Sequence, residues 1–179
     1  MGVTYGSLFS LGRGCMQGDW LLPVVYLTCT RAGLDRTSLA RLLGVPGSTA
    51  KKLVWAAARR GLVRVEEGYI RATTRGLELI EKVEYVARRA NKLVFLVQGR
   101  LLMVVVRPRR GLRAYSIPSS LACKVYSVVA SGVDSPREVA ARTGTHPKTA
   151  SIVMRALQVL DCPGADCVLA ELCGPGGKE

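Results

Sequence analysis

Residues 48–59 carry hydroxyl, lysine, tryptophan and arginine side chains in a pattern that suits contact with a polyanion. Four apolar residues recur at helical spacing and would face a core: Ala50, Leu53, Val54 and Ala57. The opposite face then carries Ser48, Thr49, Lys51, Lys52, Trp55 and Arg59. Hydroxyls and lysines at the start of a helix suit phosphate, and Lys52 and Arg59 are long enough to reach guanine edges. Trp55 either touches a sugar or a base methyl group or, as we favour, packs against a neighbouring domain.

The elements that must position these side chains occur twice, 100 residues apart. The aligned pairs are Ala40 and Ala140, Gly44 and Gly144, Thr49 and Thr149, Ala50 and Ala150, Leu53 and Val153, and Ala56 and Ala156. Each copy predicts a short helix, a tight turn at the glycine and a second helix opened by Ser or Thr. This order is typical of a helix-turn-helix, a motif that places its second helix in the major groove of DNA.

The second copy has fewer charges on the face that would meet DNA. Its outward side chains include Lys148, Thr149 and Arg155, beside His146. Two firm charges bind phosphate weakly, so contact with DNA and a partner-binding or dimer role are equally open for this copy.

The net charge of +13 is unevenly distributed along the chain. Residues 1–92 hold 15 Lys and Arg against 7 Asp and Glu, residues 93–117 hold five Arg and no acid, and residues 118–179 hold six of each sign. A polyanion should therefore be bound by the first part and by the central segment. The alternative is a solvated basic surface with no ligand.

Apolar periodicity and turn residues predict an α+β protein with two winged-helix or helix-turn-helix domains joined by a small β-rich linker. Residues 1–92 would form the first domain, with an irregular arm over 1–18, a hairpin over 62–72 and a long helix from Arg75 to Asn91. Residues 93–117 would form a basic linker of two or three strands. Residues 118–179 would form the second domain, with a cysteine-containing tail in place of a second hairpin.

The hairpin region resembles a known family. The stretch Gly61-Leu-Val-Arg-Val-Glu-Glu-Gly-Tyr-Ile-Arg-Ala-Thr-Thr-Arg-Gly-Leu-Glu-Leu-Ile looks like the wing and following helix of prokaryotic and archaeal winged-helix regulators of the MarR/PadR kind. The resemblance covers residues 19–92. It implies double-stranded DNA as the partner, transcription regulation as the role, and a homodimer built on the long helix. The apolar residues of that helix are Leu79, Ile80, Val83, Val86, Ala87 and Ala90.

Two further groups of arginines are candidates for contact with DNA. Arg64, Arg71 and Arg75 flank the hairpin and suit the phosphate backbone, but the hairpin tip is the acidic pair Glu66-Glu67, which a groove would repel. The other group is Arg107, Arg109 and Arg110, beside Pro108. These arginines either enter a minor groove or form a solvated turn, and the sequence favours neither.

The cysteines Cys162, Cys167 and Cys173 leave three states open: a disulfide such as Cys162–Cys167 or Cys162–Cys173, a metal or cluster, and free buried thiols. Three thiols after a winged-helix unit are similar in a general way to iron–sulphur winged-helix proteins such as the archaeal transcription factor E beta lineage. However, the chain has no Cys-x-x-Cys pair, and a fourth ligand would have to come from Cys123, Cys29 or Cys15. We therefore expect a disulfide and no cofactor.

Composition and motif content bear on three further questions: whether the protein is an enzyme, where it is located and what role it has. A single His, no Gly-rich phosphate loop and no clustered carboxylates argue against an enzyme. No signal peptide or membrane span is predicted, so we expect a cytoplasmic, nucleoid-associated protein. Nineteen Arg against seven Lys, one Asn, three Gln and six Cys fit an intracellular protein of a thermophile, of archaeal type. Besides regulation, two roles stay open: replication initiation or DNA segregation, and assembly of the transcription machinery through protein contacts.

Overall fold

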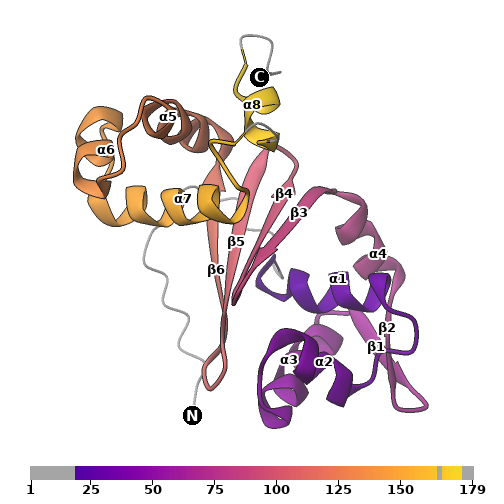
Figure 1. Ribbon diagram of the computed structural model, residues 1–179. Coiled ribbons are helices and arrows are strands. Elements are labelled where there is room, and N and C mark those ends of the chain that lie inside the picture. The colour runs from indigo at the N-terminus through magenta and orange to yellow at the C-terminus, as the bar shows by residue number, and fades with distance from the viewer. Residues whose placement is uncertain (1–18, 165–166, 175–179) are drawn as a thin grey trace. The chain divides into compact units, whose positions relative to one another are not determined.

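The computed structural model describes residues 19–164 and 167–174 (Figure 1), so the arm expected over residues 1–18 lies outside the described residues. The elements in chain order are η1 (Asp19–Leu21), α1 (Leu22–Thr30), α2 (Arg36–Leu43), α3 (Gly47–Arg59), β1 (Val63–Glu66), β2 (Tyr69–Ala72), α4 (Thr74–Glu81), β3 (Val83–Arg89), β4 (Lys92–Val97), β5 (Arg100–Arg107), β6 (Gly111–Pro118), α5 (Ser119–Ala130), α6 (Pro136–Thr143), α7 (Pro147–Val159) and α8 (Val168–Leu172). The α+β class is confirmed.

The chain forms two compact units. The described residues of unit 1 are 19–83 and 104–114, and those of unit 2 are 84–103, 115–164 and 167–174. Unit 1 contains α1 to α4 with the β1–β2 hairpin, together with the loop between β5 and β6. Unit 2 contains α5 to α8 and most of the second sheet.

In unit 1, a tight turn joins α2 to α3. The side chain of Asp35 accepts a hydrogen bond from the backbone N–H of Ser38 at 2.7 Å and so caps α2. Gly44 ends the helix in the left-handed conformation, with φ of 69°, and the N–H of Val45 donates to the carbonyl of Ala40 at 3.0 Å. The extended Pro46 then precedes α3, which begins at Gly47 without a side-chain cap, so the prediction that Ser or Thr opens this helix is wrong.

The inward face of α3 is the one that its periodicity predicts. Ala50, Leu53, Val54 and Ala57 are all buried. They lie in a core with Leu39 and Leu43 of α2 and the apolar side of α1. Because Ala40 and Ala50 are small, α2 and α3 can approach closely at this contact.

The predicted hairpin of unit 1 is confirmed. β1 and β2 are antiparallel with Val63 opposite Ala72 and Glu66 opposite Tyr69. Glu67 and Gly68 both have positive φ, 50° and 85°, which gives the two-residue turn that matches strand twist. Thr73 then caps α4 by accepting from the N–H of Gly76 at 3.2 Å.

The long helix predicted from Arg75 to Asn91 is wrong. α4 ends at Glu81, and residues Val83–Arg89 form strand β3. This segment contains good helix formers, but its β-branched and aromatic residues suit a strand, and pairing with β4 overrides a weak local preference. A homodimer built on one long apolar helix therefore has no support in the structure.

The second sheet contains four strands in the order β3-β4-β5-β6, where the sequence predicted two or three. Short loops join consecutive strands, so neighbours run antiparallel. Between β4 and β5, Gln98 and Gly99 have φ of 47° and 68° and form a two-residue turn. Residues 93–97 are all buried, which identifies β4 as a central strand with both faces covered.

Unit 2 repeats the geometry of α2 and α3. Gly144 is left-handed with φ of 67°, and the N–H of Thr145 donates to the carbonyl of Ala140 at 3.0 Å. α7 buries Ala150 and Val153, the counterparts of Ala50 and Leu53, and packs against β4. In the described part of the chain no strand follows α7, in agreement with the predicted loss of a second hairpin.

The close approach of α4 to the backbone of Leu62, just before β1, makes Gly76 a sensitive position. A Cβ atom at Gly76 would collide with the carbonyl oxygen of Leu62 and press on Val25. We predict that Gly76→Ala lowers the free energy of unfolding by about 1–3 kcal/mol, because overpacking outweighs the better helix propensity of Ala. Gly47→Ala is the control: Gly47 is in open space at the start of α3 and should tolerate Ala. Urea unfolding measures both, and equal midpoints for the two variants would contradict the prediction.

The cap of α2 should make stability depend on pH. The hydrogen bond from the N–H of Ser38 lowers the pKa of Asp35 below its usual range. A carboxylate with a lowered pKa stabilises the folded state at neutral pH, and this contribution is lost as the pH falls through the lowered value. We predict that Asp35→Asn has a lower melting temperature than wild type at neutral pH and that the difference shrinks as the pH falls below the usual pKa range of an aspartate. A difference independent of pH would show that the charge has no part in the cap.

Candidate nucleic-acid interface

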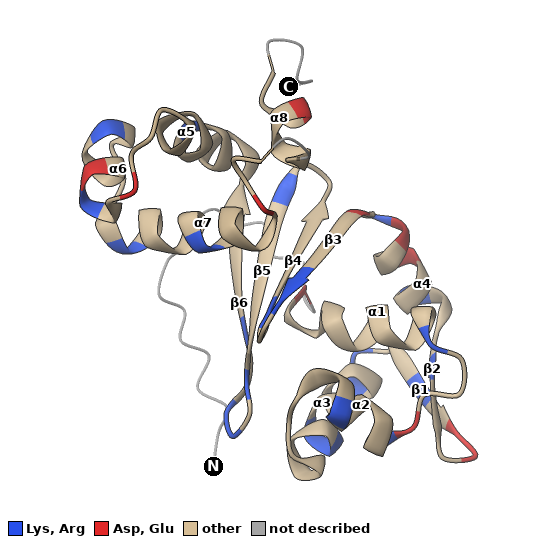
Figure 2. Ribbon diagram, in the orientation of Figure 1, with Lys and Arg blue, Asp and Glu red and all other residues tan. Residues whose placement is uncertain are grey.

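Helix α3 contains basic residues and no acidic one (Figure 2). All of the side chains predicted for its outward face are exposed or half-buried: Ser48, Thr49, Lys51, Lys52, Trp55 and Arg59. Their charges reach solvent because small and apolar residues occupy the opposite face. The structure therefore brings together the first group of residues that the sequence singled out.

Trp55 and Arg59 form a pair on this face. The indole of Trp55 is 60% exposed, and the guanidinium carbon of Arg59 lies 4.8 Å from its ring centroid. A cation over an aromatic ring is attracted by the electron-rich face, so this contact holds Arg59 over the ring. The exposed indole remains open to a ligand.

The β1–β2 hairpin has little net charge. Arg64 and Arg71 are opposite each other in the register, and the carboxylate of Glu66 pairs with both, at 3.1 Å and 3.6 Å. Glu67 follows at the turn. The two glutamates cancel the two arginines, and Arg75, although exposed, belongs to the first turn of α4.

The loop between β5 and β6 has the opposite character. Arg109 and Arg110 are exposed and Arg107 is half-buried. The hydroxyl of Thr49 donates to the carbonyl of Pro108 at 3.4 Å, which places this loop at the first turn of α3 within unit 1. Sequence reasoning named both groups but missed that they are neighbours, because 59 residues separate Thr49 from Pro108.

The second copy keeps the turn but lacks counterparts of the basic residues Lys51, Lys52 and Arg59. Ser151, Ile152, Arg155 and Val159 occupy the places of Lys51, Lys52, Trp55 and Arg59. Lys148 and Arg155 are exposed, Thr149 is half-buried, and His146 caps α7 by accepting from the N–H of Lys148 at 3.1 Å. Contact of Lys148, Thr149 and Arg155 with DNA stays a prediction.

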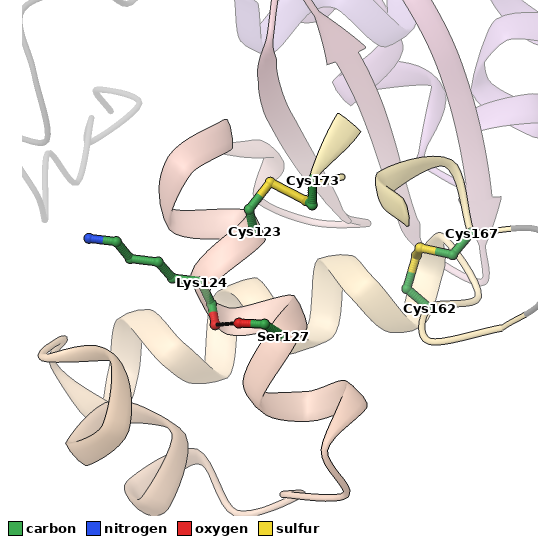
Figure 3. Close-up of a disulfide and its surroundings, with 6 residues drawn as sticks. All are labelled: Cys123, Lys124, Ser127, Cys162, Cys167 and Cys173. Atoms are coloured by element: carbon green, nitrogen blue, oxygen red, sulfur yellow. Dashed lines mark hydrogen bonds between the residues drawn. A yellow bond between two sulfur atoms is a disulfide. The ribbon is translucent and has the colours of Figure 1, made fainter. Parts of the chain in front are cut away.

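The cysteines of unit 2 form two disulfides (Figure 3). Cys162 pairs with Cys167, one of the pairings that we expected, whereas Cys173 pairs with Cys123 of α5. The Cys162–Cys173 alternative is therefore wrong. Because their sulfur atoms are in disulfides, Cys162, Cys167 and Cys173 offer no thiolate ligand to a metal in this state. No group of metal-binding side chains occurs among the described residues.

Comparison of the chain with protein-family models, with curated proteins and with solved structures finds no match. None of the helices in residues 19–164 and 167–174 combines the length and the apolar character needed to cross a bilayer.

The two disulfides should differ in their contribution to stability. Cys123–Cys173 closes a loop of 50 residues and Cys162–Cys167 a loop of 5 residues. Chain entropy then predicts that Cys123→Ala/Cys173→Ala lowers the free energy of unfolding by about 4 kcal/mol. Cys162→Ala/Cys167→Ala should lower it by about 2 kcal/mol. Urea unfolding of the oxidised proteins measures both losses. A larger loss for the second pair would mean that packing of the buried Cys162 and Cys167, and not chain entropy, dominates.

Proposed function

We propose that the chain binds double-stranded DNA through α3, whose exposed face enters the major groove. The observation that carries this proposal is the face itself, which exposes Lys51, Lys52, Arg59 and the indole of Trp55, with no acidic residue on the helix. The alternative is a basic surface that only keeps the protein solvated. Such a surface would need neither an arginine held over a ring nor an exposed tryptophan.

The shape of the element supports the same conclusion. A helix is about 10–12 Å across with its side chains, and the major groove of B-form DNA is about 12 Å wide. α3 packs against α2, α1, β1 and η1, and the side chains of its outward face are exposed or half-buried, so this face can approach a duplex. On this proposal, unit 1 is a winged-helix domain and unit 2 contains a second helix-turn-helix.

The side chains divide into two roles. Lys51 and Lys52 carry mobile point charges near the start of the helix and suit the phosphates that border the groove. Arg59, held over Trp55, presents a planar guanidinium that suits the paired acceptors of guanine. Contacts of both kinds would give affinity that depends on salt and also on sequence.

Regulation of transcription is the biological role that we propose for this binding. Replication initiation or segregation would instead place selected sites in repeated arrays, whereas a regulator would bind at promoters. Mapping the sites selected by the protein from genomic fragments separates these two roles.

The proposal predicts a specific change in salt dependence. Lys51→Ala/Lys52→Ala should reduce the slope of log affinity against log salt by about 2 and lower affinity on the order of tenfold or more, because two phosphate contacts are lost. Fluorescence anisotropy with sequence-selected duplexes measures both quantities. Lys124→Ala/Arg137→Ala is the matched control, since it removes two exposed positive charges from unit 2.

The control separates a defined site from general attraction. Under the proposal, Lys124→Ala/Arg137→Ala leaves the slope close to that of wild type. Equal losses in the two double variants, with equal binding to every duplex, would show that only net charge matters and would overturn the proposal.

A further inference from the structure

We infer that the loop between β5 and β6, residues 107–110, is the arm that holds DNA beside α3, in place of the β1–β2 hairpin. The inference rests on the proposed function and adds to it the element that contacts the flanking duplex. It follows from a comparison of the two hairpin loops of unit 1, which differ in charge and in ion pairing, and from a hydrogen bond that joins the β5–β6 loop to the first turn of α3.

The β1–β2 hairpin is poorly suited to this role. Glu66 accepts ion pairs from both Arg64 and Arg71, so contact of either arginine with phosphate would break an existing pair. The turn also presents Glu67, and a carboxylate near a groove is repelled by the phosphates on both sides.

The β5–β6 loop instead carries positive charges that are not neutralised by an ion pair with the described residues. Arg109 and Arg110 are exposed and form no ion pair with the described residues. Its backbone is also well defined: the N–H of Arg110 donates to the carbonyl of Arg107 at 3.0 Å, and Gly111 takes a φ of 84° to close the turn. A short loop with a fixed Pro108 loses little conformational freedom on binding.

The position of the loop is the second independent observation. The hydroxyl of Thr49 contacts the carbonyl of Pro108 at 3.4 Å, so the arginines extend from beside the end of α3 that also carries Lys51 and Lys52. A duplex with α3 in its major groove would therefore have the adjacent backbone within reach of this loop. The chemistry that it recognises is a row of phosphates, or the minor groove between two such rows, where arginine is attracted by the negative potential.

Two charge-matched variants test the inference. Arg109→Ala/Arg110→Ala and Arg64→Ala/Arg71→Ala each remove two exposed positive charges from unit 1. We expect the loop variant to reduce the salt slope by about 2 and to lower affinity on the order of tenfold. The hairpin variant should lower the affinity for DNA by no more than a few-fold, because its charges make no direct phosphate contact. Melting temperatures measured in parallel confirm that both variants are folded.

The flanking sequence identifies what the loop contacts. Duplexes with the same selected core are given flanks of A·T, G·C or inosine·C pairs, because inosine·C has the minor groove of an A·T pair and a major groove like that of G·C. A loss in the loop variant that is greater with A·T and inosine·C flanks supports insertion into the minor groove. An equal loss with all three flanks supports contact with phosphates, and either result supports the loop as the arm.

Failure of the inference is distinct from failure of the proposed function. If Lys51→Ala/Lys52→Ala weakens binding but the hairpin variant loses as much as the loop variant, or the loop variant matches Lys124→Ala/Arg137→Ala, the inference is overturned and binding by α3 stands. If wild type binds no duplex better than the Lys51→Ala/Lys52→Ala variant does, the proposed function and the inference fall together.

Discussion

The placement of α3 depends on the left-handed turn that follows α2. At Gly44 the chain reverses within a few residues, and the bond from Val45 to the carbonyl of Ala40 fixes where the next helix begins. A residue with a Cβ atom would be strained at this φ, and a larger residue in place of Ala50 would force the helices apart. Every property of the basic face follows from this arrangement, because burial of one side of α3 determines which side chains point to solvent.

Unit 2 has the same turn conformation as unit 1, but different residues on the exposed face of the helix that follows. Gly144, Ala140 and Thr145 reproduce the conformation and the hydrogen bond of the first copy. The places of Lys51 and Lys52, however, are taken by Ser151 and Ile152. Unit 2 instead contains two disulfides, one of which joins the segment after α7 to α5. A duplicated framework can therefore keep its packing while its outward surface changes.

Local rules predicted those features that depend on neighbouring residues. The turn at Gly44 and the buried face of α3 follow from residue type and spacing, and the structure agrees. The helix predicted over residues 83–89 is wrong because helix propensity is only a weak preference. The strand that these residues form depends on a partner strand later in the chain. Spacing in the sequence also did not reveal the pairing of Cys123 with Cys173.

The candidate site shows the same limit. Sequence spacing places Lys51 and Lys52 on one helix face, and it also marks the arginines of residues 107–110 as a basic cluster. Their proximity to α3 depends on the course of β5 and β6, which no local pattern encodes. The ion pairs that occupy Arg64 and Arg71 were equally hidden, since they need the register of the hairpin.

Acetylation of lysines in the free protein and in its complex with a selected duplex, read by mass spectrometry, tests the central claim most directly. Lys51, Lys52 and Lys124 are all exposed in the absence of DNA and should react readily. Binding through α3 predicts that the duplex protects Lys51 and Lys52 while Lys124 keeps its reactivity. Undiminished reactivity of Lys51 and Lys52 in the bound protein, or equal protection of all three lysines, would contradict a DNA-binding face on α3.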